Sequence, residues 1–370
     1  MLAAGLKLRT FAIALAAVAA VMAVFAGQAT AKEFGGTVYT STNSSAANAV
    51  QTFDRAPDGS LAPAASFLTG GTGTGAGLGS QGAVALDDHG RRLFVVNAGS
   101  DSITSFGVSE QGLRLRDVEP SNGDRPISLT VHGNLLYVLN AGTDQISGFR
   151  IRGGDLQPLA DSTRTLSGSG TDPAQVEFSP QGDVLVVTEK ATDRIDTFRL
   201  GRDGRPDQVR SQPSAGETPF GFAFDNRGNL IVSEAFDGAE NASALSSYSV
   251  GSDGAIAPIS PVVRTEQTAA CWVVVTDDGR FAYTTNTGSG SISSYDVERD
   301  GSISLLESVA ANTGAGSAPT DMALDADRHL FVLGSGTGTV GAYRVSGDGG
   351  LAPVDIVGGL PAGSTGLAAD

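Results

Sequence analysis

The sequence predicts an all-β protein: a seven-bladed β-propeller of four-stranded antiparallel blades, closed by the C-terminal strand joining the N-terminal blade. First, one unit recurs with a period under about fifty residues, as in 82–99 and 127–142: an apolar strand, an Asp/Asn/Gly turn, and a second strand ending near Asn. Second, the 370 residues include 50 Gly and only 17% charged residues, unlike chains rich in long helices. Third, residues 365–369 resemble an inner strand lacking the rest of its blade.

Each unit predicts the same strands in the same order. Seven innermost strands are expected, at 82–86, 127–131, 175–179, 221–225, 272–276, 320–324 and 365–369. Seven second strands should end at Asn43, Asn97, Asn140, Glu189, Glu234, Asn286 and Gly334. The third strands each carry an aromatic residue expected to pack between blades: Phe53, Phe106, Phe149, Phe198, Tyr248, Tyr295 and Tyr343.

Turn residues support the same division. An Asp-Gly pair follows five of the third strands, where a tight hairpin needs residues that tolerate positive φ. These pairs begin at Asp58, Asp203, Asp253, Asp300 and Asp348. The glycine-rich segment 70–79 lacks the spacing of a phosphate-binding loop, so it predicts a flexible connector between blades.

The N-terminus predicts export. Lys7 and Arg9 precede an apolar run over 11–26, and Ala29-Thr30-Ala31 has the small-x-small pattern of a secretory cleavage site. We therefore expect a signal peptide at 1–31, a single propeller domain at 32–370, and an extracellular or periplasmic protein. No other segment approaches the ~20 apolar residues of a membrane span. The single cysteine, Cys271, cannot form an internal disulfide.

Charge and composition exclude several partners. The formal net charge of −16 would repel a phosphate backbone, so nucleic acid is not an expected partner. One Cys and scattered histidines cannot assemble a zinc site, and the Asp-rich turns lack the alternate spacing of a calcium loop. No metal and no cofactor are therefore expected, and a G-x-S-x-G nucleophile motif is absent.

Three phrases resemble the YVTN-type repeats of the seven-bladed lactonase family, which includes 6-phosphogluconolactonase and carboxymuconate cyclase: 136–140, 176–182 and 192–195. The resemblance implies a site on the face where inner strands begin and second strands end, using a His, a Glu and Arg side chains. It places the catalytic acid/base at Glu234 and a carboxylate anchor at Arg194. An acid or base near the ring and a cation for the substrate's anion suit lactone chemistry.

The chain departs from the family's pattern at two places. The family's His falls on Ala174, or on Gln175 if the frame slips, and an Arg falls on Thr287. The three histidines present are expected in turns at the opposite face: His89, His132 and His329.

Further candidates for substrate binding are Glu189, Gln175, Asn140 and Asn286. Each has a structural alternative. An Asn at a strand end commonly bonds local backbone, Glu189 could be a solvated loop charge, and Arg194 could form a local ion pair.

Two functions follow. The first is an exported lactonase-like or cyclase-like enzyme acting on a small anionic lactone of the sugar-acid or muconate type, with a degraded active site. The second is a non-catalytic extracellular propeller that binds a ligand, glycan or protein on its upper face, for example at the cell surface. The family resemblance favours the first, and the missing residues favour the second.

Overall fold

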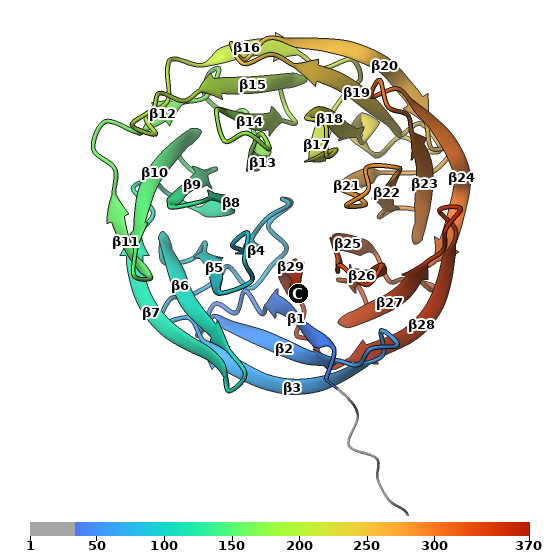
Figure 1. Ribbon diagram of the computed structural model, residues 1–370, viewed down its shortest axis with the longest axis horizontal. Coiled ribbons are helices and arrows are strands. Elements are labelled where there is room, and N and C mark those ends of the chain that lie inside the picture. The colour runs from blue at the N-terminus through green and yellow to red at the C-terminus, as the bar shows by residue number, and fades with distance from the viewer. Residues whose placement is uncertain (1–33) are drawn as a thin grey trace, which may run out of the picture. The chain divides into compact units, whose positions relative to one another are not determined.

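The computed structural model describes residues 34–370, which form a ring of seven antiparallel sheets (Figure 1). The predicted signal peptide at 1–31 lies outside these residues. Blade 1 has the strand order β29-β1-β2-β3, so the last strand of the chain lies beside the first. The other six blades each use consecutive strands, and the innermost strands in Figure 1 are β4, β8, β13, β17, β21, β25 and β29. The predicted seven-bladed propeller and its closure are confirmed.

The strands of blades 1 to 3 are as follows. Blade 1 has β29 (Thr365–Ala369), β1 (Gly36–Ser41), β2 (Ala49–Arg55) and β3 (Leu61–Leu68). Blade 2 has β4 (Val84–Leu86), β5 (Arg92–Asn97), β6 (Ser102–Ser109) and β7 (Gly112–Pro120). Blade 3 has β8 (Pro126–His132), β9 (Leu135–Asn140), β10 (Gln145–Arg152), β11 (Asp155–Pro158) and β12 (Arg164–Thr165), and both β11 and β12 pair with β10.

Blades 4 to 7 have four strands each. Blade 4 has β13 (Pro173–Phe178), β14 (Val184–Glu189), β15 (Arg194–Arg199) and β16 (Arg210–Pro213). Blade 5 has β17 (Pro219–Phe224), β18 (Asn229–Glu234), β19 (Ala244–Val250) and β20 (Ile256–Arg264), with the 3-10 turn η1 (Phe236–Gly238) between β18 and β19. Blade 6 has β21 (Ala270–Val275), β22 (Phe281–Asn286), β23 (Ser291–Val297) and β24 (Ile303–Asn312). Blade 7 has β25 (Pro319–Leu324), β26 (His329–Gly334), β27 (Thr339–Val345) and β28 (Leu351–Gly358).

The predicted strand boundaries are close to those observed. Six of the seven second strands end at the predicted residue, whereas β1 ends at Ser41, two residues before Asn43. Asn43 instead has a positive φ of 46° and bonds the connector after β3, with its Oδ1 accepting from the Thr74 N–H at 3.0 Å. The inner strand β4 is shorter than predicted and begins at Val84.

The core lies between neighbouring blades. All seven third-strand aromatic residues are buried, with at most 3% of their surface exposed. Tyr248 of blade 5, for example, packs in one cluster with Val186 and Ile195 of blade 4. Because each blade offers one apolar face to each neighbour, blade-to-blade packing supplies the burial that a single sheet could not.

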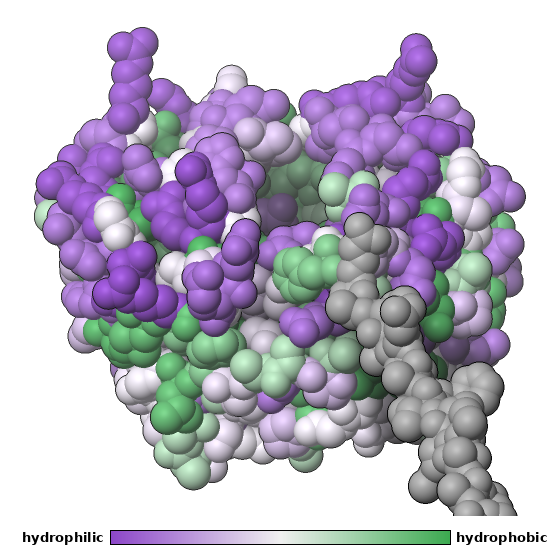
Figure 2. All heavy atoms as spheres, turned by 60° about the horizontal axis from the view of Figure 1, so that its bottom comes forward, coloured by the Kyte–Doolittle hydropathy of each residue, from purple (hydrophilic) through white to green (hydrophobic). Residues whose placement is uncertain are grey.

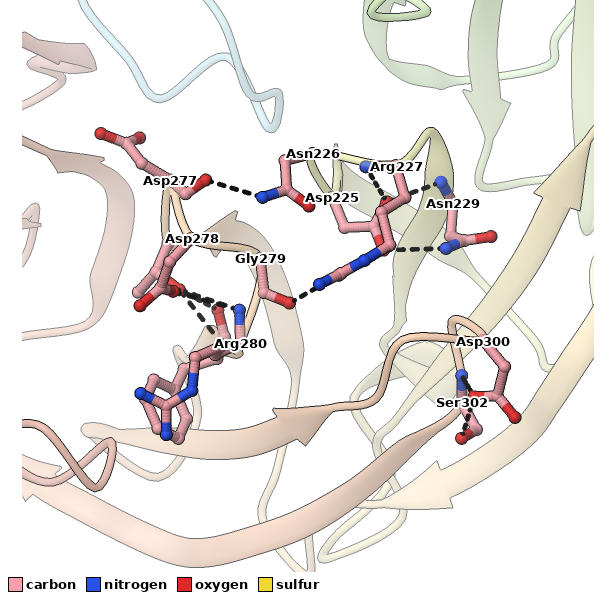
Figure 3. Close-up of polar contacts among 12 residues, drawn as sticks. Asp225, Asn226, Arg227, Asn229, Asp277, Asp278, Gly279, Arg280, Asp300 and Ser302 are labelled. Atoms are coloured by element: carbon pink, nitrogen blue, oxygen red, sulfur yellow. Dashed lines mark hydrogen bonds and ion pairs between the residues drawn. The ribbon is translucent and has the colours of Figure 1, made fainter.

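The predicted Asp-Gly hairpins are also present. Each of the five glycines has a positive φ, between 79° and 87°. In blade 6 the Asp300 carboxylate accepts hydrogen bonds from the Ser302 N–H and hydroxyl at 3.0 and 2.6 Å (Figure 3). This local bond fixes the turn without help from other blades.

Closure of the ring depends on the C-terminal residue as well as on β29. The Asp370 carboxylate accepts from the Thr37 N–H at 2.6 Å and from the Tyr39 hydroxyl at 3.0 Å. The buried Arg55 guanidinium lies 3.1 Å from both Asp325 and Asp327 of blade 7. Blade 1 is therefore held by its own two chain ends and by an ion pair to its neighbour.

No helix within residues 34–370 has the length and apolar character needed to cross a membrane.

Candidate functional site

The upper face is defined here as the face where inner strands begin, and the lower face as the one where they end. The catalytic candidate Glu234 ends β18 at the upper face, and its side chain is fully buried. Its carboxylate accepts from the Gly216 N–H at 2.8 Å, and from the Ser214 and Tyr248 hydroxyls at 3.3 Å each. Burial raises the pKa of Glu234, and these donors offset that effect only in part. The carboxyl group is thus enclosed by its own blade and the connector that precedes it.

The anchor candidate Arg194 begins β15, one blade earlier. Its Nε donates to the Ser211 hydroxyl at 2.5 Å, and one terminal nitrogen donates to the Ser211 carbonyl at 3.1 Å. Within residues 34–370 it forms no ion pair, and it shares no hydrogen-bond partner with Glu234. The structure therefore gives Arg194 and Glu234 separate sets of contacts.

The aspartate before Arg194 links blades. Asp193 has a positive φ, and its carboxylate accepts from the Thr218 N–H of the next blade at 2.7 Å. Asp101 makes the same kind of contact with the Arg125 N–H at 2.7 Å. Since the feature recurs, the aspartate of the family-like phrase is explained by the blade repeat itself.

Glu189 occupies the equivalent slot to Glu234 in blade 4 and is also fully buried. Its carboxylate accepts from the Ser167 N–H at 3.0 Å and the Ser167 hydroxyl at 2.6 Å, while Asp196 accepts from the same N–H at 2.9 Å. Burial, and then the neighbouring Glu189, raise the pKa of Asp196 to about 8. The predicted solvated alternative for Glu189 is wrong, because the residue belongs to a buried carboxyl pair.

The two asparagine candidates also bond within the protein. Asn140 donates to the Ser121 carbonyl at 3.2 Å, and Asn286 donates to the Ser291 and Ser293 hydroxyls at 3.1 and 2.8 Å. Both are fully buried. Asn140 agrees with the structural alternative, a bond to backbone, whereas Asn286 bonds two serine side chains instead.

Gln175 joins two inner strands. Its Oε1 accepts from the Phe222 N–H at 2.8 Å, and its Nε2 donates to the Phe222 carbonyl at 2.9 Å. The same nitrogen donates to Glu177 at 2.7 Å. Gln175 therefore binds blade 4 to blade 5 along the channel wall.

The connector between β3 and β4 follows a specific path instead of the predicted flexible one. Residues 76–82, here called the axial connector, reach the centre of the ring (Figure 1). The Ser80 carbonyl accepts from the Trp272 indole at 2.9 Å, and the Gly79 carbonyl accepts from Lys190 at 2.7 Å. Gln81 donates to the Val273 carbonyl at 2.8 Å. These contacts lie along the upper halves of the inner strands, so the axial connector fills the channel at that level.

Below the axial connector, a pocket of about 500 Å³ opens on the lower face. Its walls are the lower ends of β8, β13, β17 and β21, and Glu177, Phe178 and Phe224 are among its residues. Figure 2 shows this central hollow with apolar side chains on its wall beneath a mostly hydrophilic rim. Burial raises the pKa of Glu177 to about 8, and the hydrogen bond from Gln175 opposes the rise.

This pocket was not predicted from the sequence. A signal was available, because Glu177 occupies a strand position held by small or apolar residues in the other six inner strands. The register places Ala85, Thr130, Ala223, Val274, Ala323 and Ala368 there. The three histidines lie at the lower face as predicted, and His132 is on the pocket wall.

Neither a reactive thiol nor a group of metal ligands is found among residues 34–370. Cys271 is buried, and desolvation raises the pKa of its thiol to about 12, so the thiolate is not populated at neutral pH. Among the described residues no three His, Cys, Asp or Glu side chains are placed to hold a metal ion.

Solved structures show the same architecture. A proposed 6-phosphogluconolactonase of Bacteroides uniformis is 20% identical, with a TM-score of 0.71 over 90% of this chain and 99% of that one. The periplasmic gluconolactonase PpgL of Pseudomonas aeruginosa is 18% identical, with a TM-score of 0.69 over 89% and 98%. Virginiamycin B lyase of Staphylococcus aureus is 14% identical, with a TM-score of 0.53 over 73% and 82%. Likeness at these identities concerns the fold.

Sequence comparison identifies the family. An uncharacterised protein of Staphylococcus epidermidis is 26% identical over 183 residues, which are 47% of this chain and 52% of that protein. The chain thus spans about half the length of the curated relatives it matches. The family model described as lactonase, 7-bladed β-propeller, matches residues 31–235 and 235–364. The chain therefore belongs to the seven-bladed β-propeller lactonase family.

Proposed function

We propose that this protein is an exported lactonase-like propeller whose upper-face site is degraded, so that it hydrolyses or forms a small anionic lactone only slowly. In this proposal Glu234 is the remaining acid/base candidate and Arg194 the remaining anchor. Family membership supports the lactonase-like class. The lactone would be of the sugar-acid or muconate type.

The enclosure of Glu234 is the observation that carries this proposal. A general acid or base must come within hydrogen-bond reach of the proton it transfers. Glu234 has no exposed surface, and its donors come from its own blade and the preceding connector. The guanidinium of Arg194 is bound to Ser211. Both groups are therefore already bonded within the protein.

The missing family residues support the same conclusion. Ala174 is fully buried, and the side-chain amide of Gln175 is hydrogen-bonded to the backbone N–H and carbonyl of Phe222. Loss of a positioned acid/base group typically lowers a rate about 10²- to 10⁴-fold. Slow turnover is therefore the expected consequence.

Export rests on the N-terminal segment. The basic residues, the apolar run and the Ala29-Thr30-Ala31 pattern are those of a cleaved signal peptide. N-terminal sequencing of the protein from a culture supernatant or periplasmic fraction tests this part, with a start near Lys32 expected.

The enzymatic part is tested with a panel of glucono-, 6-phosphoglucono- and muconolactone. We expect the natural sequence to hydrolyse one of these lactones slowly, but measurably above the spontaneous rate. Glu234→Gln should lower this hydrolysis to the spontaneous rate, because it removes the acid/base candidate. Glu217→Gln, a matched control at an exposed carboxylate of the same connector, should leave it unchanged. No hydrolysis above the spontaneous rate, and no change in Glu234→Gln, would remove the enzymatic part of the proposal.

A second candidate is a non-catalytic extracellular propeller that binds a ligand, glycan or protein. The lower pocket favours this function, because it is a concave site of ordinary ligand-binding size in a region that the family-like residues do not reach. Binding without turnover in a ligand screen by thermal shift would support it.

A further inference from the structure

The lower pocket has the size and position of a ligand site. Its volume of about 500 Å³ lies within the range of about 300 to 1,000 Å³ typical of small-molecule pockets. The ends of four inner strands and the turn after β4 surround it, and the axial connector lies above it. The walls are strands of a closed ring, so the pocket is preformed.

The charged side chains on its wall are all acidic. Asp88, Glu177, Asp225 and Asp277 contribute to the lining, whereas no Lys or Arg does. An anionic lactone would meet repulsion here, which separates this pocket from the upper-face proposal.

The acidic residues are not equivalent. Asp225 is 1% exposed and accepts from the N–H groups of Arg227 and Asn229 at 2.8 Å each, so it holds the turn of its own blade (Figure 3). Asp277 is exposed, and only its backbone carbonyl is bonded, by Asn226 at 3.1 Å. In Figure 3 the Asp277 carboxylate points away from the other residues drawn.

Glu177 lies deeper than Asp277. It precedes the last residue of β13, whereas Asp277 follows the end of β21 by two residues. One carboxyl oxygen of Glu177 accepts from Gln175, and this is the only hydrogen bond of the carboxyl group to residues 34–370. A ligand could therefore meet a carboxyl group at each end of the pocket.

Part of the pocket wall is apolar. Val131 and Val275 lie near the ends of β8 and β21. Phe178 is 5% exposed and packs against Tyr137 in the core, so the ring that is partly open to the pocket is that of Phe224 in the adjacent blade. Such rings attract both apolar groups and cations. A bare metal ion does not fit, because the described carboxylates are not grouped as metal ligands.

We propose that the lower pocket binds a small organic cation, an amine carried on an apolar ring, with its ammonium group at Glu177 and its ring against Phe224 and the neighbouring valines, while the exposed Asp277 adds negative potential at the mouth of the pocket. This site is independent of lactone chemistry. Its selectivity comes from acidic side chains that attract a cation but, among the described residues, are not grouped as metal ligands, beside an apolar wall that holds a ring.

The raised pKa of Glu177 predicts that ligand binding is coupled to the release of a proton. With a pKa of about 8, this carboxyl group is mostly protonated at pH 7, and an ammonium group beside it favours ionisation. Binding should then release about one proton. The other titratable groups around the pocket are Asp88, His132, Asp225 and Asp277, with Asp321 on the neighbouring inner strand β25.

Three probes of similar shape test the charge requirement: tryptamine, tryptophol and indole-3-acetate. Isothermal titration calorimetry at pH 7 and low salt should show tryptamine binding about tenfold or more tightly than the other two, because only its ammonium group can form a charge-assisted hydrogen bond with Glu177. Titrations in two buffers of different ionisation enthalpy should reveal the released proton.

Two variants and one control locate the site. Glu177→Gln should weaken tryptamine binding about tenfold and abolish the proton release, since an amide cannot ionise. Asp277→Asn, at an exposed residue whose change leaves the fold intact, should weaken binding in the same direction. Glu110→Gln, at an exposed carboxylate outside the pocket, should bind tryptamine as the natural sequence does.

Several outcomes would overturn the proposal. These are no heat of binding at millimolar tryptamine, equal binding of tryptophol, or unchanged binding in both Glu177→Gln and Asp277→Asn. None of them depends on the lactone assay, so either proposal can fail while the other stands.

Discussion

The side-chain amide of Gln81 pairs with the backbone of Val273, 192 residues away. Its Oε1 accepts from the Val273 N–H at 3.0 Å, and its Nε2 donates to the Val273 carbonyl at 2.8 Å. One blade earlier, Gln175 makes the same two bonds to Phe222. Two glutamines from different parts of the chain thus satisfy equivalent backbone groups on β17 and β21.

Glycine explains why Gln81 is needed. The position equivalent to Gln175 on β17 is Gly221, which has no side chain to reach the next blade. Gln81 of the axial connector takes that place, and a Cβ on Gly221 would lie 2.2 Å from its Oε1. The axial connector therefore has two roles. Its Gln81 supplies the hydrogen bonds to β21 that Gly221 cannot make, and its backbone fills the upper channel.

Gly221→Ala should accordingly destabilise the protein. The added methyl group would also lie 2.6 Å from the Cys271 carbonyl, so both a side chain and a backbone group must move. Overpacking of this kind costs about 1–3 kcal/mol, measurable as a lower urea midpoint. Gly168→Ala is the control, because nothing lies within 4 Å of its added Cβ. Equal midpoints for the two variants would show that the axial connector gives way without cost.

Arg55→Met should weaken closure of the ring. Arg55 is 3% exposed, and its guanidinium contacts Asp325 and Asp327 at 3.1 Å each and the Asp370 carbonyl at 3.2 Å. Removing one partner of a buried ion pair typically costs about 3–5 kcal/mol, because the remaining charge stays buried.

The measurement is the free energy of unfolding in urea, together with hydrogen exchange of the β29 amides. Arg114→Met is the matched control at an exposed arginine without a hydrogen-bond or ion-pair partner among the described residues. If Arg55→Met loses no more stability than this control, the ion pair does not hold blade 1 in place.

The stability of the protein should fall as pH rises from about 4 to about 8. Glu177 has its pKa raised to about 8 by burial, whereas an unfolded Glu titrates near about 4.3. Between these values the folded state binds the proton that the unfolded state has lost, so stability decreases with rising pH until about 8. Asp196, at about 8, and Asp321, at about 7, act in the same direction.

Glu177→Gln tests this directly. Its melting temperature should fall less between pH 5 and pH 9 than that of the natural sequence, and the remaining fall belongs to the other raised carboxyl groups. Glu110→Gln should keep the full dependence. Parallel curves for Glu177→Gln and the natural sequence would mean that Glu177 titrates normally in the folded protein.

The fold could be predicted because its information is local and repeated. The third-strand aromatics and the Asp-Gly hairpins recur blade after blade, so one misjudged unit is corrected by its neighbours. The lone strand 365–369 was equally informative, since an unpaired inner strand must complete the blade that lacks one. Even its boundaries were predicted correctly.

The repeated sequence pattern does not predict in which direction the side chains at the strand ends point. Glu189 and Glu234 were expected at the rim of a shared site, but the structure turns both carboxylates into buried contacts with serine and backbone donors from the preceding connector. A connector's path depends on contacts with other blades, and its glycine-rich sequence encodes little of that path.

The sequence by itself determined the number of blades, their strands and their closure, because each depends on short patterns within one unit. Only the tertiary structure decided that the axial connector fills the upper channel and that Glu177 and Asp277, 100 residues apart, line one pocket. Both relationships join residues of different blades around the axis of the ring. Those residues become neighbours only when all seven blades close into a ring, so no short sequence pattern predicts their contact.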